Sequence, residues 1–225
     1  MGLFSTKSSE SDNELATNFY FPTSKNALII FTRNPELGKC KTRLAKTIGD
    51  EAALEVYKYL LKHTAEISKN IKADKFVFYS DGVTKDDLWN TSIFRKKLQY
   101  GPDLGTRMEN AFTELFQLNY KKVVIIGSDL LDLKTKHVDD AFQLLETNEL
   151  VIGPAKDGGY YLLGMKSLHL KIFKNKAWGN STVFKDTIKD IQNSSYALMK
   201  ELNDIDTFED IKLYQELRKF YNTND

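Results

Sequence analysis

The chain has 225 residues, of which 41% are hydrophobic and 12% aromatic, a length that fits one large globular domain. Its 32 basic and 31 acidic residues leave a net charge of +1 and are mixed along the chain, which argues against electrostatic binding to nucleic acid or anionic lipid. A single cysteine, Cys40, excludes an internal disulfide framework and a cysteine-rich zinc site, and it favours a reducing, cytoplasmic location. The longest apolar runs fall far short of the roughly 18 residues that span a bilayer, so we expect no integral membrane segment.

Residues 1–25 are expected to form a flexible leader, because they are polar and lack the apolar core of a secretory signal. The leader begins with a glycine, Gly2, followed four positions later by Thr6, which fits a pattern for N-myristoylation that also arises often by chance. Residues 26–225 contain no repeat, no low-complexity block and no linker. We therefore expect them to form one domain.

From residue 26 onward, short β-rich runs alternate with stretches of helical period, which is typical of an α/β layered domain. Strands are predicted at Ala27–Phe31, Lys75–Ser80, Lys122–Gly127, Leu150–Pro154 and Tyr160–Met165, with an edge strand at Tyr196–Met199. Helices are predicted from Asp50 as N-cap to Ile67, over Leu104–Leu115, Val138–Leu145 and Phe184–Ile191, and from Thr207 to Tyr221. In the last of these helices, Thr207 and Asp210 have the spacing of a capping box.

A cation-rich loop follows the first predicted strand: Gly38 stands before Lys39, Lys41 and Arg43. Glycine lets the backbone approach a ligand closely, and cations just before a helix can meet the negative charge of phosphates. A Walker A loop is disfavoured, because Arg33 occupies the position of its first glycine. The loop therefore predicts an oligophosphate cradle of another kind, and the alternative is that its cations only solvate the start of a helix.

An acidic turn follows the most apolar strand, where the run at residues 122–126 ends in Gly127, Ser128 and Asp129. A near-continuous apolar strand is buried on both faces, so the turn lies at the edge of a sheet. A carboxylate there can bind Mg²⁺, whose other ligands are usually phosphate oxygens and water. Asp129 is our first candidate for a metal ligand, and a simple turn-capping role is the alternative.

A second acidic turn, Asp157-Gly158-Gly159, leads into the strand at Tyr160. Asp157 could bind substrate hydroxyls or act as a general base, while a plain hairpin turn is the alternative. Downstream, Trp178 and Ser181 suggest the wall and floor of an acceptor pocket together with the two glycines, although Trp178 could equally serve ordinary packing.

Near the C-terminus, Asp204 and Asp206 alternate along an extended segment. We expect only one of these two acids to face the site.

Five ordered blocks give the chain a family resemblance: residues 38–44, 101–108, 127–129, 153–164 and 204–207. Together they resemble a small bacterial glycosyltransferase-like family that has the GT-A fold of nucleotide-diphospho-sugar transferases and is akin to phospholactate guanylyltransferase. The resemblance implies one Rossmann-like α/β domain with a mostly parallel central sheet flanked by helices. In the acidic turn, Leu131 stands where the family usually has proline.

The resemblance also implies roles for individual residues. Lys41 and Arg43 would meet the phosphates, Asp129 would hold a divalent metal, Mg²⁺ or Mn²⁺, and Asp204 or Asp206 would complete the metal site. The other candidates for phosphate binding, each in or next to one of the resembling blocks, are Arg33, Gly38, Arg107 and Ser128.

Two chemistries fit such a site. In the first, which the resemblance favours, a small-molecule acceptor attacks the anomeric carbon of a nucleotide sugar and Asp157 serves as base. In the second, an anionic substrate attacks the α-phosphorus of a nucleoside triphosphate and pyrophosphate leaves. A nucleotide-binding module without catalysis is a third interpretation.

Overall fold

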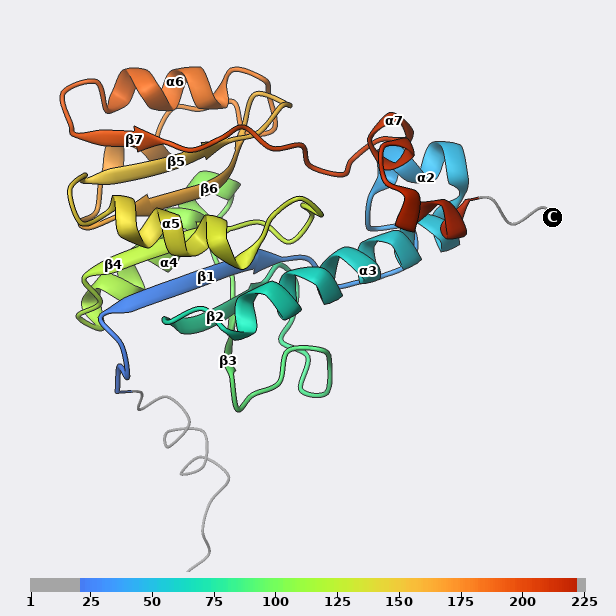
Figure 1. The fold of residues 1–225 in the computed structure, drawn as a ribbon, viewed down its shortest axis with the longest axis horizontal. Coiled ribbons are helices and arrows are strands. Elements are labelled where there is room, and N and C mark those ends of the chain that lie inside the picture. The colour runs from blue at the N-terminus through green and yellow to red at the C-terminus, as the bar shows by residue number, and fades with distance from the viewer. Residues whose placement is uncertain (1–20, 222–225) are drawn as a thin grey trace, which may run out of the picture.

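The computed structural model describes residues 21–221, and the polar run at residues 1–20, with its myristoylation pattern, lies outside the described residues. Within them, seven strands form one sheet in the order β3-β2-β1-β4-β6-β5-β7 (Figure 1). The strands are β1 (Asn26–Thr32), β2 (Asp74–Tyr79), β3 (Phe94–Leu98), β4 (Lys122–Ile126), β5 (Leu150–Pro154), β6 (Tyr160–Met165) and β7 (Tyr196–Leu198). Every pairing is parallel except the two made by β6, so the predicted mostly parallel sheet is confirmed.

All six predicted strands are present, and β7 is an edge strand as expected. The sequence analysis missed β3 at the opposite edge. Its residues read Phe-Arg-Lys-Lys-Leu, and the three consecutive cations hide the alternation of apolar and polar residues that marks a strand. Basic side chains on an edge strand are a common protection against pairing with another chain.

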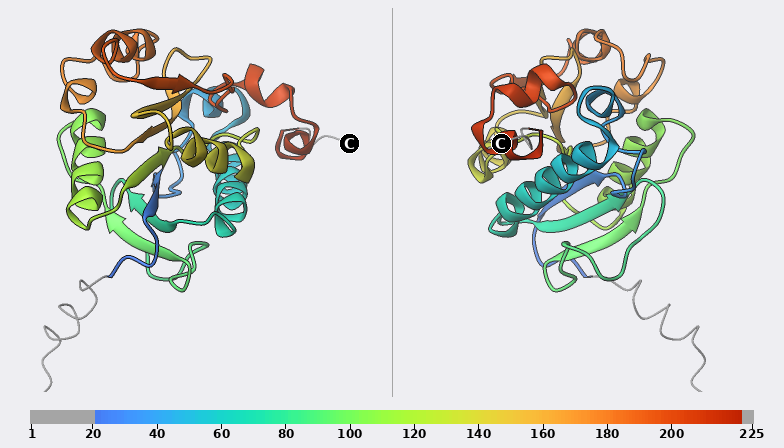
Figure 2. Two further views of the ribbon diagram at one scale, coloured as in Figure 1. Left: turned by 60° about the vertical axis from the view of Figure 1, so that its left-hand side comes forward. Right: turned by 90° about the vertical axis from the view of Figure 1, so that its right-hand side faces the viewer.

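Helices cover both faces of the sheet (Figures 1 and 2). The helices are α2 (Thr42–Ile48), α3 (Asp50–Lys69), α4 (Leu104–Gln117), α5 (Thr135–Leu144), α6 (Val183–Asp190) and α7 (Phe208–Lys212), with short 3₁₀ helices at Leu170–Phe173 and Gln215–Phe220. Leu28 and Ile30 of β1 face a core that includes α3 and α5 residues, whereas Ala27 and Ile29 face a core that includes α4 residues. This alternation is the period-two pattern of a strand buried on both faces.

A third apolar cluster lies at one end of the molecule and joins segments that are distant in sequence. Its members include Leu44 of α2, Val56 of α3, Ile211 of α7 and Ile205, which precedes α7. Figure 1 shows α2 and α7 together at one end of α3. Leu131, which replaces the expected proline, is buried in the same cluster. The cluster therefore fixes α2, and the cation-rich loop before it, next to the segment that carries Asp204 and Asp206.

Two details of the helix predictions are wrong. The N-cap of α3 is Gly49 and not Asp50, because Gly49 adopts a positive φ of 87° that ends α2 and lets α3 start at the next residue. The last helix does not run unbroken from Thr207 to Tyr221: α7 ends at Lys212, and Tyr214 is extended before the final 3₁₀ turn. The break directs the Tyr214 hydroxyl to Asp132, to which it donates a hydrogen bond of 2.8 Å. The capping box at the start of α7 is confirmed.

Across residues 21–221, no helix combines the length and the hydropathy that crossing a bilayer requires.

Candidate active site

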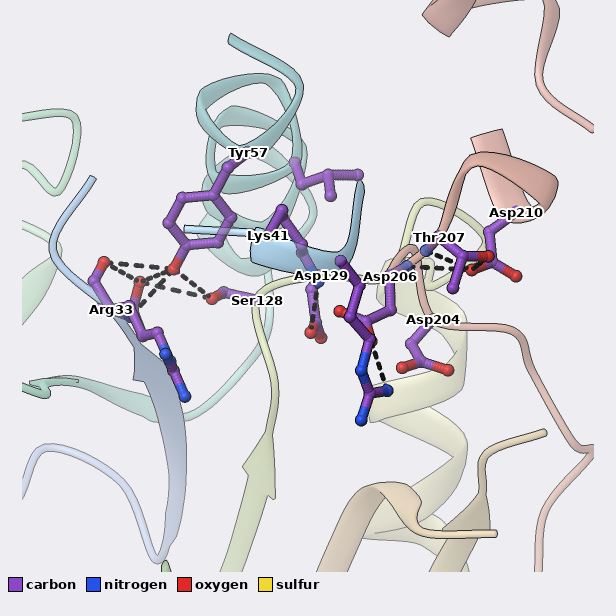
Figure 3. Close-up of polar contacts among 12 residues, drawn as sticks. Arg33, Lys41, Tyr57, Ser128, Asp129, Asp204, Asp206, Thr207 and Asp210 are labelled. Carbon is purple, nitrogen blue, oxygen red and sulfur yellow. Dashed lines mark hydrogen bonds and ion pairs between the residues drawn. The ribbon is translucent and has the colours of Figure 1, made fainter. Parts of the chain in front are cut away.

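The cation-rich loop and the acidic turn meet at an ion pair between Lys41 and Asp129 (Figure 3). The Lys41 Nζ donates to Asp129 Oδ2 at 3.0 Å, and only 7% of the Lys41 side chain is exposed. Lys41 is the residue before α2 and has a left-handed backbone, with φ 48° and ψ 45°. This conformation is unusual for a residue with a side chain, and such residues often occur at functional sites. The predicted meeting of a loop cation with the acid of the central strand is thus present in the structure.

A second ion pair lies beside the first. Arg43 Nη1 donates to Asp206 Oδ2 at 2.8 Å, and here 68% of the arginine side chain is exposed. The backbone brings the two acidic segments together, because the Ile205 amide donates to the Asp129 carbonyl oxygen at 3.0 Å. Asp204 therefore lies close to Asp129, and Figure 3 shows the carboxyl groups of Asp129, Asp206 and Asp204 gathered below α2.

The closeness of these carboxylates shifts the pKa values of Asp204 and Lys41. Burial, together with the nearby negative charges of Asp129 and Asp157, raises the pKa of Asp204 to about 6. Burial lowers the pKa of the Lys41 ammonium, but the three surrounding carboxylates raise it by more, so its pKa lies above the ordinary value. Lys41 is therefore charged at neutral pH, and the acids around it carry more negative charge than it can balance.

A cavity of about 270 Å³ opens directly beside these groups. Asp129, Asp157 and Asp204 line it, together with Gly159 and Trp178. The rest of its wall is mostly apolar and comes from β1, β4, β6, the start of α4 and the loop before α6: Phe31, Leu104, Met108, Ile125, Ile126, Gly127, Leu130, Ala155, Tyr160, Tyr161, Leu162, Leu163, Gly179, Asn180 and Val183. The strand ends and the loops after them therefore form a pocket where ligands of such sheets usually bind.

Two of the predicted pocket residues do not line this cavity. Gly158 has a positive φ of 87°, and a Cβ there would come within 2.2 Å of the Ser181 carbonyl oxygen. Gly158 and Ser181 thus pack backbone against backbone and fix the Asp157 turn to the loop before α6. The alternative for this turn, a hairpin, is present, since it joins the antiparallel strands β5 and β6. Within the turn the Gly159 amide donates to Asp157 Oδ1 at 2.8 Å.

Ser128 and Arg33 belong to a separate network around Tyr57 of α3 (Figure 3). The Tyr57 hydroxyl accepts from the Arg33 amide at 2.9 Å and lies 3.5 Å from the Ser128 hydroxyl. Ser128 also donates to the Thr32 hydroxyl at 3.3 Å. These bonds tie the ends of β1 and β4 together beneath the site, so in this structure Ser128 acts in positioning. The Arg33 residue is exposed and takes no part in the two ion pairs.

The remaining phosphate-binding candidates lie in loops. Gly38 has a positive φ of 73°, which supports the predicted need for glycine in the loop. Arg107 donates from Nε to the Gly101 carbonyl oxygen at 3.0 Å, which anchors the loop before α4, and it does not line the cavity. Cys40 is buried and its Sγ donates to the Asn34 carbonyl oxygen.

The sequence analysis did not find Tyr57 or most of the apolar cavity wall. Tyr57 lies inside the helix predicted after Asp50, and no local signal shows that its hydroxyl reaches two strand ends. Met108 and Tyr160 likewise lie inside a predicted helix and a predicted strand. An aromatic or methionine residue reads the same in sequence whether it faces a core or a cavity.

The donor set fits a hard divalent cation. In residues 21–221 no group of three or more His, Cys, Asp or Glu side chains is placed to hold a metal. Of the three acids that line the cavity, Asp129 and Asp204 are the pair that could hold one between them. Mg²⁺ is usually bound by one or two carboxylates plus phosphate oxygens and water. Burial and then the neighbouring charge of Asp129 raise the pKa of Asp204, and a divalent cation would offset both. The carboxylate of Asp206 is directed to Arg43.

Comparison with known proteins gives a family and named relatives. The family described as "Uncharacterized protein conserved in bacteria (DUF2064)" matches residues 63–180, which is more than half of the chain. A 2-phospho-L-lactate guanylyltransferase from Methanocaldococcus vulcanius is 26% identical over 172 residues, covering 75% of this chain and 72% of that protein. The protein of the same name from Methanocaldococcus fervens is 26% identical over 135 residues, which is 60% of this chain and 59% of that one, less than two thirds of its length.

Among solved structures, a "putative nucleotide-diphospho-sugar transferase" from Desulfovibrio desulfuricans G20 has the same fold. The two share 29% sequence identity with a TM-score of 0.80, and the match covers 90% of each chain. The Rossmann-like fold expected from the resemblance is therefore confirmed.

Proposed function

The chain belongs to the DUF2064 family, and from this membership, its relatives and its site we propose that it is a metal-dependent nucleotidyltransferase. The reaction transfers the nucleoside monophosphate group of a nucleoside triphosphate to a small acceptor and releases pyrophosphate. Such a transfer needs little covalent participation by the protein, and catalysis comes from positioning and from neutralising the phosphate charge.

The observation that carries this proposal is the contact between Lys41 Nζ and Asp129 Oδ2. It supports a site where a cation from the loop after β1 and an acid from the turn after β4 act on the same phosphates. Lys41 and Arg43 would bind the phosphate oxygens, and Asp129 and Asp204 would hold the metal. A divalent metal held there would supply further neutralisation of the charge that develops on the leaving pyrophosphate.

The relatives favour nucleotidyl transfer over the glycosyl transfer that the sequence analysis put first. The two Methanocaldococcus proteins named above are guanylyltransferases, and the match to one of them covers nearly three quarters of each chain. Glycosyl transfer remains the second candidate because the Desulfovibrio protein, at 29% identity over 90% of the chain, carries the name of a nucleotide-diphospho-sugar transferase. Asp157 lines the cavity, where it could serve as the base of that reaction.

One experiment separates these chemistries. The protein is incubated with Mg²⁺ or Mn²⁺ and each of the four nucleoside triphosphates, with 2-phospho-L-lactate or small alcohols as acceptors, and pyrophosphate is measured. A parallel set uses nucleotide-diphospho-sugars, and the nucleoside diphosphate is measured. We expect pyrophosphate release that depends on both metal and acceptor. Release of nucleoside diphosphate alone would establish glycosyl transfer, and tight nucleotide binding without either product would support a non-catalytic module.

A further inference from the structure

The position of the cavity divides the site into two parts. The cation-rich loop follows β1, whereas the cavity wall comes largely from β4, β6 and the loop before α6. Asp129 belongs to both parts, since it accepts from Lys41 and also lines the cavity. If the proposed function is correct, the phosphates of the donor lie on the loop side of Asp129 and the acceptor lies in the cavity. The following inference rests on that function.

The lining of the cavity is acidic and contains no cation. Its charged residues are Asp129, Asp157 and Asp204, and no Lys, Arg or His from the part of the chain that the structure describes lines it. The loop cations Lys41 and Arg43 pair with Asp129 and Asp206 and do not themselves line the cavity. A metal held by Asp129 and Asp204 would be balanced by these two carboxylates and by the donor phosphates. An acceptor with its own phosphate or carboxylate groups would therefore still meet the like charge of Asp157, without the partner that a desolvated anion needs.

The remaining surface suits an apolar body. The Trp178 ring lies over α4 at Gly105, where a Cβ would come within 2.5 Å of the ring, so only glycine lets the ring close this side of the cavity. The neighbouring strands β4 and β6 contribute Ile125 and Leu163, which are paired side by side, and the cavity also includes Met108, which is 5% exposed. At about 270 Å³ the cavity is near the lower end of the range of roughly 300–1,000 Å³ for small-molecule pockets. It therefore fits a small ligand.

We propose that the cavity beside Asp129 receives an acceptor with an uncharged, apolar body and presents its hydroxyl group to the α-phosphorus of the nucleotide. The hydroxyl oxygen forms a bond to that phosphorus, and the bond from the phosphorus to the oxygen bridging to the β-phosphorus breaks. Pyrophosphate leaves with the electron pair, and the hydroxyl proton passes to the carboxylate of Asp157, which lines the same cavity. The acceptor of this chain is thus an alcohol and not the phosphorylated acid named in its guanylyltransferase relatives.

A pair of matched probes tests the charge preference without any turnover. The probes are 4-phenyl-1-butanol and 4-phenylbutanoate, which share an apolar body and differ in charge. Binding is followed in the absence of nucleotide by the fluorescence of Trp178, the cavity tryptophan, with Trp89 buried elsewhere. We expect the alcohol to give a saturable change at a concentration at least about tenfold below that needed by the anion, because like charges across a contact are disfavoured. Equal or tighter binding of the anion would overturn the proposal.

Two variants test whether the fluorescence signal comes from the cavity and whether charge sets the preference. The Trp178→Phe variant should lose the fluorescence change, and a change that persists in it would place the probe outside the cavity and overturn the proposal. Asn180 lines the cavity and is exposed, so Asn180→Lys introduces a cation at little risk to the fold. We expect this variant to bind 4-phenylbutanoate about tenfold more tightly than the unmodified protein does, with the alcohol little changed. No gain for the anion would show that charge does not set the preference.

Turnover is measured separately, as pyrophosphate release with the alcohol, Mg²⁺ and each nucleoside triphosphate. Release stimulated by the alcohol and not by 2-phospho-L-lactate supports both proposals. Release stimulated by 2-phospho-L-lactate and not by the alcohol overturns the proposal that the acceptor is an uncharged alcohol. If the alcohol binds preferentially but no acceptor ever stimulates release, the proposed function fails while the charge preference of the cavity stands.

Discussion

Lys41 and Arg43 lie two residues apart and each forms an ion pair with an acid of the site, but the two pairs differ in exposure and in backbone setting. The Lys41–Asp129 pair has a lysine side chain that is 7% exposed, whereas the arginine of the Arg43–Asp206 pair is 68% exposed. Lys41 sits in a left-handed turn before α2, and Arg43 lies on the first turn of that helix. One cation is therefore held in place by its surroundings, and the other is free to change partners.

This difference in exposure indicates which of the two ion pairs a bound substrate can replace. An exposed ion pair contributes only about 0–1 kcal/mol because water screens it, so a phosphate group can replace Asp206 as the partner of Arg43 at small cost. A desolvated cation must keep a compensating charge, so Lys41 stays beside Asp129 or exchanges it for an equally close anion. We expect Lys41 to be preorganised for phosphate binding and Arg43 to add affinity once the nucleotide is present.

The largest expected effect is that of Asp129→Asn, which removes the charge from the acid shared by the loop and the cavity and keeps its size. Pyrophosphate release should fall at least about a hundredfold, since even groups that only support metal ligands contribute roughly 10–100-fold. Mg²⁺ should no longer strengthen nucleotide binding, which isothermal titration with and without metal would measure. The control is Asp139→Asn on the exposed side of α5. Unchanged metal dependence in Asp129→Asn would show that Asp129 does not hold the metal.

A smaller effect is expected for Lys41→Met, which keeps the length of the side chain without its charge. Loss of a charged hydrogen bond to a phosphate should weaken nucleotide binding by about 1.5–3 kcal/mol, or roughly 10- to 150-fold in Kd. The matched control is Lys39→Met in the same loop, where the lysine is 72% exposed and pairs with Glu36. If Lys41→Met and Lys39→Met both bind nucleotide as tightly as the unmodified protein, then Lys41 does not bind the phosphates.

Local patterns predicted the α/β class and the chemical types at the site, and the family resemblance implied the Rossmann-like, mostly parallel sheet. Apolar runs marked the strands of the mostly parallel sheet, and the ends of β1 and β4 carried the cations and the acid that the structure brings together. The predicted cytoplasmic location, the single domain over residues 26–225 and the metal stay predictions.

What the sequence could not predict are relations set by packing between distant segments. Asp204 and Asp206 could not be told apart until the Ile205 amide was seen to bind the Asp129 carbonyl oxygen, which places Asp204 at the cavity. Tyr57 is 24 residues from Arg33 and 71 from Ser128, and no spacing in the chain records that its hydroxyl reaches both. The charge of the cavity wall likewise follows from which side chains turn inward, a property of the three-dimensional packing.

The segment that supplies Asp204 and Asp206 can be loosened without touching either acid, through Asp210. Burial raises the pKa of Asp210, but hydrogen bonds from Asn203, Thr207 and the Asp206 amide lower it by more, so its pKa lies below the ordinary value of about 3.9. A carboxyl with a lowered folded pKa contributes stability above its unfolded pKa, and that stability is lost as the pH falls through the folded value.

For Asp210→Asn we therefore expect about 1 kcal/mol of lost stability at pH 7, the usual scale for a helix cap. Urea denaturation of both proteins should show a constant difference between pH 5 and 8 that shrinks below about pH 4, because the ionised carboxyl of the unmodified protein is then lost. Glu209→Gln is the control, since Glu209 is exposed on the same turn of α7 and pairs with Lys212. A difference that stays constant at low pH would mean that the charge of Asp210 has no part in holding the segment.

The smallest expected effect is that of Arg43→Gln, and it sharpens the comparison most directly. In the protein without ligand the change should alter the free energy of unfolding by less than about 1 kcal/mol, because the Arg43–Asp206 pair is exposed. Nucleotide binding should weaken by an amount smaller than in Lys41→Met and should depend more strongly on salt, since an exposed cation is screened more than a buried one. Titrations at two salt concentrations for Arg43→Gln, for Lys41→Met and for the control Lys46→Gln, an exposed position on α2, measure this. If Arg43→Gln costs more binding energy than Lys41→Met, then the arginine is the main phosphate ligand and burial of Lys41 serves only to hold α2 against the acidic turn.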